Sequence, residues 1–161
     1  MMCVPVPAGE EMKLNYEISI DASLDRVWAA FDNPANMRRW QQNFHSHTHK
    51  SGQPGQPGSV GELVFDENGR KVVLKETITE RRAPDFLAAI YESGQGSTLV
   101  VNHFKAIDAN TTHWSSWCNI TFRGMMKFMS LFVAGRVRRR TEADMQRFKL
   151  MVESDEAGNG A

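Results

Sequence analysis

The sequence predicts an α+β fold in which an antiparallel sheet of about seven strands is covered by a long C-terminal helix. Two observations carry this prediction. Between residues 59 and 122, segments with alternating apolar and polar residues are separated by turn signals, which is typical of an antiparallel meander. From Gly124 the apolar spacing changes to a helical period that continues for about 28 residues, to Val152.

The first elements are a strand and two short helices. Residues 13–20 alternate strictly, as a half-buried strand requires. Ser23 can cap a helix, because apolar residues then recur at helical spacing at Leu24, Val27, Trp28 and Phe31. Asn33 and Pro34 fit the cap and first position of a second helix that ends near Trp40.

Residues 44–58, FHSHTHKSGQPGQPG, are expected to leave a strand and enter a glycine- and proline-rich connection. His45, His47 and His49 share one side of an extended strand, opposite Phe44, so we expect all three imidazoles to face water. The outer two would then be about 13 Å apart, too far for one zinc ion. His103 and His113 are also expected to point outward, and we predict no metal site and no cofactor.

The remaining strands are expected at 59–66, 70–80, 86–92, 97–107 and 111–122, with a turn at Asn68-Gly69. On strand 111–122 the apolar residues occupy the even positions, which are therefore expected to face inward. The same reasoning on each strand gives these inner-face candidates for a ligand site: Leu74, Glu76, Leu87, Ala89, Tyr91, Val100, Asn102, Phe104, Trp114, Ser116 and Cys118. An ordinary apolar core would give a similar list.

Two polar residues, Glu76 and Asn102, interrupt the apolar inner face. A carboxylate there must be paired, lie near water or carry a raised pKa, unless a strand edge or bulge turns it to solvent. Glu76 is therefore the candidate general acid or base.

The long helix is expected to form the other wall of a pocket. Its apolar stripe weakens near Gly135, so we expect the pocket opposite that turn, bounded by Met125, Met129 and Phe132. The basic run 136–140 is interpreted as a solvated, salt-bridged helix surface, with contact to an anionic ligand group at the pocket mouth as the alternative.

Composition narrows the class of protein. The 161 residues carry no net charge, which argues against a nucleic-acid partner. Two cysteines without a CxxC motif favour the cytoplasm, and no apolar stretch is long enough for integral membrane association. We expect a flexible segment 1–11, one domain 12–153 and a disordered tail 154–161, in a monomer or homodimer. No nucleophile elbow, HExxH, phosphate loop or dinucleotide motif occurs.

The stretch ISIDASLDRVWAAFDNPANMRRW resembles the opening pattern of the START/SRPBCC superfamily, which includes the birch-pollen allergen and bacterial polyketide cyclase/dehydrase-like proteins. The matching positions are Ala22, Val27, Trp28, Asp32 and Trp40. The segments SGQPGQPGSVGELVF, PDFLAAIYE and FRGMMKFM also resemble family segments in the expected order, so the resemblance covers residues 12–153.

The resemblance implies a helix-grip fold, in which a curved sheet and the long helix enclose a cavity. It also implies binding or transport of a small hydrophobic molecule such as a lipid or polyketide. One alternative is a cyclase or dehydratase in which Glu76 acts as general acid or base and Asn102 or Tyr91 polarises a carbonyl. A second alternative is a protein-interaction module with a collapsed cavity.

Overall fold

A computed structural model describes residues 11–124 and 130–158. Its strands are β1 (Glu11–Ile20), β2 (Phe44–Ser51), β3 (Val60–Glu67), β4 (Arg70–Arg82), β5 (Phe86–Ser93), β6 (Gly96–Asp108) and β7 (Thr111–Phe122). Its helices are α1 (Leu24–Phe31), the short 3₁₀ helix η1 (Pro34–Asn36), α2 (Met37–Trp40) and α3 (Ser130–Gly158).

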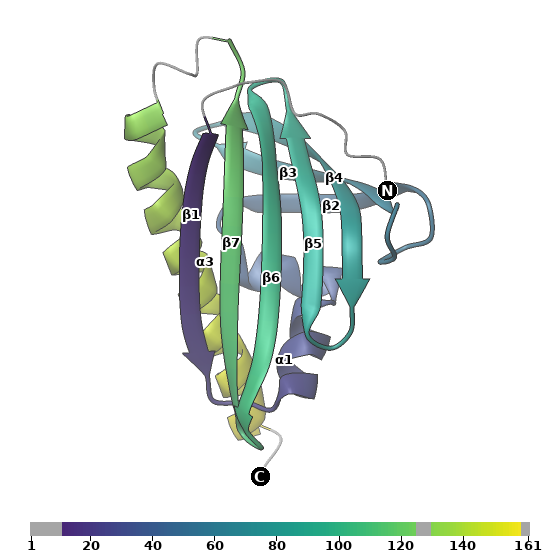
Figure 1. Cartoon of the computed structure of the whole chain (residues 1–161), viewed down its shortest axis with the longest axis vertical. Coiled ribbons are helices and arrows are strands. Elements are labelled where there is room, and N and C mark those ends of the chain that lie inside the picture. The colour runs from purple at the N-terminus through teal and green to yellow at the C-terminus, as the bar shows by residue number, and fades with distance from the viewer. Residues whose placement is uncertain (1–10, 125–129, 159–161) are drawn as a thin grey trace.

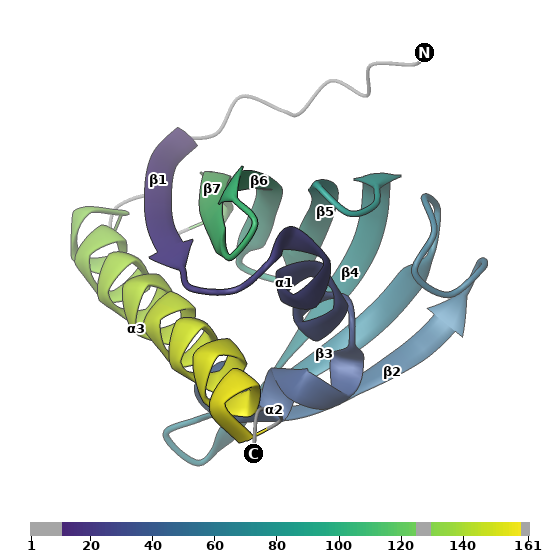
Figure 2. The ribbon, with the colours of Figure 1, turned by 90° about the horizontal axis from the view of Figure 1, so that it is seen from below.

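The strands form one antiparallel sheet in the order β1-β7-β6-β5-β4-β3-β2. Figure 1 shows β1 and β7 beside α3, and the strand order places β2 at the opposite edge of the sheet from β1. Seen from below in Figure 2, the sheet curls from β1 round to β2, and all the helices lie on its concave side. The predicted α+β helix-grip architecture is therefore confirmed.

Local turn chemistry explains why the strands fall where the sequence predicts them. Asn68 and Gly69, between β3 and β4, both have positive φ angles of 52° and 79°. This backbone conformation is the one that a two-residue hairpin turn needs, and an Asn-Gly pair adopts it readily. The strands expected at 59–66, 70–80, 86–92, 97–107 and 111–122 all begin and end within two residues of their predicted bounds.

The long helix ends later than predicted. It continues to Gly158, although the segment after Ser154 was expected to be a disordered tail. Polar contacts hold its last turns against the rest of the domain. The guanidinium of Arg39 donates two 2.8 Å hydrogen bonds to the Asp155 carboxylate, and Glu153 accepts a 2.8 Å bond from the Asp21 backbone. A small, polar composition alone does not reveal such contacts.

A cluster of aromatic side chains packs α3 against the sheet and the short helices. The ring of Phe148 is completely buried, with ring centroids 5.3 Å from Trp40, 5.2 Å from Trp114 and 6.0 Å from Phe31. Among the described side chains of α3, the buried ones all follow residue 144: Met145, Phe148, Met151 and Val152. The C-terminal half of α3 therefore packs into the core, whereas the described side chains of its earlier turns are partly buried or exposed.

The core also explains the opening sequence pattern. Ala22, Val27, Trp28 and Trp40 are all buried. The Trp28 ring lies edge-on to Phe104 with centroids 5.8 Å apart. No helix in the described part of the chain is long and apolar enough to cross a bilayer.

Candidate functional site

A cavity of about 1210 Å³ lies between the concave face of the sheet and the first turns of α3. Apolar side chains from the sheet that line it include Leu63, Phe65, Leu74, Leu87 and Val100. The helices contribute Phe31, Trp40, Val133, Val137 and Met145. A space of this size can hold a ligand of drug size or larger. Most of the surface of its wall is apolar, although polar and charged side chains from the sheet, the short helices and α3 also line it.

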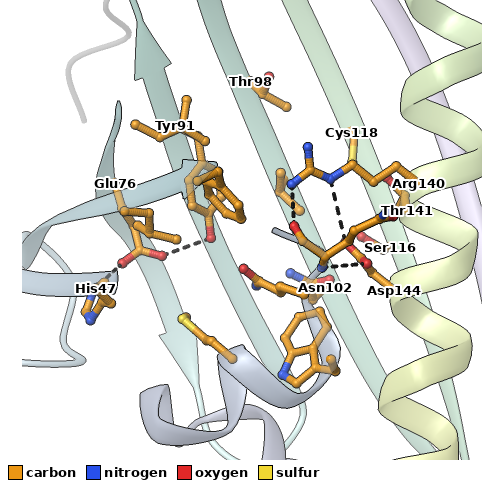
Figure 3. A pocket seen from close by; sticks show the side chains of 18 of the residues that line it. His47, Glu76, Tyr91, Thr98, Asn102, Ser116, Cys118, Arg140, Thr141 and Asp144 are labelled. Atoms are coloured by element: carbon orange, nitrogen blue, oxygen red, sulfur yellow. Dashed lines mark hydrogen bonds and ion pairs between the residues drawn. The ribbon is translucent and has the colours of Figure 1, made fainter. Parts of the chain in front are cut away.

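The structure brings most of the predicted inner-face residues to this wall. The cavity is lined by Leu74, Glu76, Leu87, Tyr91, Val100, Asn102, Trp114, Ser116 and Cys118. The strand registers explain this result, since Glu76, Tyr91 and Thr98 are successive cross-strand partners on one face. Figure 3 shows these polar side chains pointing into the same space.

Two predicted residues are buried but do not line the cavity. Phe104 packs among aromatic rings, with its centroid 4.9 Å from Phe31 and 5.5 Å from Trp114. Ala89 lies on the inner face between its partners Ile78 and Val100, whose longer side chains reach the cavity instead. Both residues belong to the core of the domain rather than to the site.

The side chains predicted to bound the pocket on the helix side lie outside the described part of the structure, and other side chains of α3 line the cavity. Met125, Met129 and the side chain of Phe132 lie outside the described part of the structure. Gly135 itself is exposed and does not line the cavity, but Val133, Arg136 and Val137 of the same turn do. Of the described side chains on α3, those that line the cavity run from Val133 to Met145.

The prediction that all three histidines of β2 lie on its outer side is wrong for His47 and His49, which both line the cavity, although His49 also stays exposed. A β-bulge lies between Phe44 and Ser46, which leaves His45 as an extra residue in the strand. The bulge shifts the alternation by one, so that His47 pairs with buried Leu63 and faces inward. His45 remains outside, where its Nδ1 atom lies 3.3 Å from the Asp66 carboxylate.

His47, Glu76 and Tyr91 form a chain of polar contacts at the cavity wall. The Tyr91 hydroxyl donates a 2.9 Å hydrogen bond to Oε1 of Glu76, and Nε2 of His47 lies 3.2 Å from Oε2 of the same carboxylate. Only 8% of the Glu76 surface is exposed. The carboxylate that the sequence placed on an inner face is thus buried and paired on both oxygens (Figure 3).

A glycine makes room for this arrangement. Gly61 on β3 is the cross-strand partner of Glu76. A Cβ atom at Gly61 would lie 2.6 Å from Nε2 of His47 and 3.2 Å from Oε2 of Glu76. Any larger residue would therefore displace the imidazole from the carboxylate.

Burial shifts the pKa values of two weak acids of the cavity wall, the Tyr91 phenol and the Cys118 thiol. It raises the pKa of the Tyr91 phenol well above its usual value, and the Glu76 charge raises it further. Tyr91 therefore remains a hydrogen-bond donor at neutral pH. Burial also raises the pKa of the Cys118 thiol to about 11, although a hydrogen bond with Ser116 opposes the shift. Cys118 is consequently a poor nucleophile.

Asn102 presents a separate polar group. The Trp114 indole nitrogen donates a 3.0 Å hydrogen bond to Oδ1 of Asn102. Because an indole nitrogen can only donate, this bond fixes which end of the amide is the oxygen. The NH₂ group of Asn102 is left as a donor at the cavity wall, suited to a carbonyl or hydroxyl oxygen.

Two ion pairs hold the walls of the cavity together. At one, Arg81 of β4 binds Asp32 at 2.6 Å and donates to the Gly55 carbonyl at 2.9 Å, which ties α1 and the glycine-rich connection to the sheet. Burial nevertheless raises the pKa of the Asp32 carboxyl. At the other, Arg140 of α3 binds Glu67 and donates to the Gln42 carbonyl at 2.7 Å.

The sequence did not identify every lining residue. His49, Leu63, Phe65 and several residues of the short helices also line the cavity. The alternation along β3 could have identified Leu63 and Phe65, which occupy odd-numbered apolar positions. The bulge in β2 prevented the same reasoning from placing His47 and His49 on the inner face. Within residues 11–124 and 130–158, no three histidine, cysteine or acidic side chains are grouped as a metal site requires.

A family model described as polyketide cyclase/dehydrase and lipid transport matches residues 11–153. The chain belongs to this polyketide cyclase/dehydrase and lipid transport family. The match covers every described strand and most of α3, which agrees with the resemblance read from the sequence. No curated protein matches the chain.

Solved structures similar to this family member share its fold. The Zhui aromatase/cyclase from a Streptomyces species has a TM-score of 0.80 at 14% identity, covering 94% of this chain and 99% of that one. Ara h 8.0201 has a TM-score of 0.74 at 13% identity, with coverages of 90% and 99%. A protein from Thermus thermophilus has a TM-score of 0.73 at 12% identity, with coverages of 89% and 99%. At these identities the likeness establishes the helix-grip fold alone.

Proposed function

We propose that this protein binds a small, largely apolar molecule in the cavity between the sheet and α3. The observation that carries the proposal is the cavity of about 1210 Å³, whose wall is mostly apolar surface. The sheet and α3 do not close onto each other here, whereas elements of a domain core normally pack to the density of an organic crystal. A ligand would bury the apolar wall that the protein's own side chains leave uncovered.

The polar groups support a ligand that carries an oxygen function. The Asn102 amide can donate to a carbonyl or hydroxyl oxygen, while the Tyr91 hydroxyl is already engaged with Glu76. Family membership and the folds of Ara h 8.0201 and the aromatase/cyclase are compatible with such a ligand.

A cavity-filling substitution tests the proposal. Leu74 lines the cavity, so Leu74→Trp is expected to occupy part of the space and to weaken binding of the neutral dye phenylnaphthylamine at least about tenfold. The measurement is a fluorescence titration, supported by native mass spectrometry of the protein for co-purified small molecules.

The neighbouring residue provides a matched control. Val73 is 48% exposed and points to the opposite face of β4, so Val73→Trp should bind the dye as the unmodified protein does. Equal dye binding by the two tryptophan variants would contradict a ligand site in this cavity, as would an unmodified protein that binds no dye.

The second candidate is a cyclase or dehydratase, and the paired Glu76 carboxylate favours it. A buried carboxylate with His47 on one oxygen and Tyr91 on the other is oriented to take a proton from a carbon next to a carbonyl. The Asn102 amide could then stabilise the oxygen of the enolate that forms.

Turnover separates this candidate from simple binding. The expected result is cyclised or dehydrated product from a linear poly-β-ketone, followed by absorbance and mass spectrometry. Glu76→Gln should slow turnover and still bind phenylnaphthylamine, because the amide retains the side-chain shape. Absence of product above the uncatalysed rate would count against an enzyme of this class.

A further inference from the structure

We propose that Arg136 and Arg139 of α3 bind an anionic group, a carboxylate or a phosphate, at the mouth of the cavity, so that the ligand is an amphipathic acid rather than a neutral molecule. This inference rests on the proposed binding function and specifies its ligand class.

The four arginines between positions 136 and 140 have different surroundings. Arg138 forms an ion pair of 3.6 Å with Glu142, and its guanidinium lies 5.8 Å from the Tyr16 ring centroid. Arg140 is held by Glu67 and the Gln42 carbonyl. These contacts agree with the predicted salt-bridged helix surface for this pair of residues.

Arg136 and Arg139 do not follow that pattern. Both are exposed, and both line the cavity. A spacing of three residues places them on the same side of a helix, about one turn apart. Within the described part of the chain, neither arginine has a carboxylate partner in an ion pair.

The acidic residues of the cavity wall are already engaged. Asp32 is paired with Arg81, Glu67 with Arg140, and Glu76 with His47 and Tyr91. The fourth lining carboxylate, Asp144, accepts a 2.9 Å hydrogen bond from the Gln42 backbone and lies 3.4 Å from Arg147. The paired acids therefore leave two guanidinium groups beside the opening.

Two guanidinium groups next to an apolar space match a particular kind of molecule. Each guanidinium can donate two parallel hydrogen bonds to a carboxylate or phosphate. Val133 and Val137 of the same helix line the cavity beside them, so an apolar chain attached to the anion would continue inward. The protein carries no net charge, which means that the attraction is local to this mouth.

A pair of dyes with one ring skeleton tests the charge directly. Anilinonaphthalene sulfonate carries a sulfonate that neutral phenylnaphthylamine lacks. In the double variant Arg136→Gln with Arg139→Gln, the Kd of the sulfonate dye should rise about tenfold, because two solvent-exposed charge contacts are lost. The Kd of the neutral dye should stay unchanged. Arg138→Gln removes a charge from the same helix outside the cavity wall and should alter neither value.

Natural anions distinguish the two possible head groups. Dodecanoate and dodecyl phosphate are titrated as competitors against bound phenylnaphthylamine, with dodecanol as the neutral reference. We expect at least one of the two anions to displace the dye at lower concentration than dodecanol, and the double variant to remove that advantage.

The outcomes separate this inference from the proposed function. If both dyes lose affinity equally in the double variant, or if dodecanol competes as well as both anions, the assignment of Arg136 and Arg139 as an anion site is overturned while the cavity remains a ligand site. If the unmodified protein binds neither dye, the binding function itself is overturned.

Discussion

Phe148→Ala should lower the free energy of unfolding by about 3–5 kcal/mol, the range for removing a buried aromatic ring from a core. Phe148 is completely buried, and its ring contacts those of Trp40, Trp114 and Phe31. These neighbours come from α1, α2 and β7 and cannot all move in to fill the space. Chemical denaturation monitored by tryptophan fluorescence measures the loss.

The matched control lies two residues further along the same helix. Leu150 is 57% exposed, so Leu150→Ala should change the free energy of unfolding by less than about 0.5 kcal/mol. Similar losses in the two variants would show that α3 is not anchored through the aromatic cluster. The site depends on this anchor, because the core contacts of the C-terminal half of α3 leave its earlier turns free to form a cavity wall.

The parts of the fold that could be predicted from the sequence are those that the pattern of neighbouring residues determines without contacts from elsewhere in the chain. Along β7 the even positions are buried from Thr112 to Phe122, so one register accounts for the whole strand. The Asn68-Gly69 pair has the positive φ angles that fix the turn of the hairpin between β3 and β4. In both cases, neighbouring residues carry all the information that the prediction needs.

The parts that were wrong depend on contacts distant in the sequence. Nothing within FHSHTHKS marks His45 as the bulge, which follows from how β2 pairs with β3. The end of α3 depends on Arg39, which is 116 residues away from its partner Asp155. Likewise, the inner-face alternation gave Glu76 the correct side but could not supply its partners, because His47 reaches it only through the bulge and the space at Gly61.

Glu76 and Tyr91 offer a second test, in which single and double substitutions should not add. Tyr91→Phe removes the donor to Oε1 of a carboxylate that is only 8% exposed. Leaving a buried acceptor without its donor costs about 1–3 kcal/mol of unfolding free energy. When Glu76→Leu is made as well, no buried carboxylate is left that needs the phenol as a donor, and the loss should be smaller than the sum of the two single losses.

The double-mutant cycle is measured by denaturant unfolding of the four proteins, and we expect a coupling energy of at least about 1 kcal/mol for residues in direct contact. The size of the coupling energy also shows whether water in the cavity can replace the Tyr91 hydroxyl as a hydrogen-bond donor to Glu76. If water in the cavity replaces the phenol, Tyr91→Phe will cost less than about 0.5 kcal/mol and the coupling will vanish, because water satisfies the carboxylate equally well. That result would contradict the structural role of the hydrogen bond. A strong coupling would instead mean that the Glu76 carboxylate is held by protein groups, in the fixed orientation that either a ligand contact or proton transfer requires.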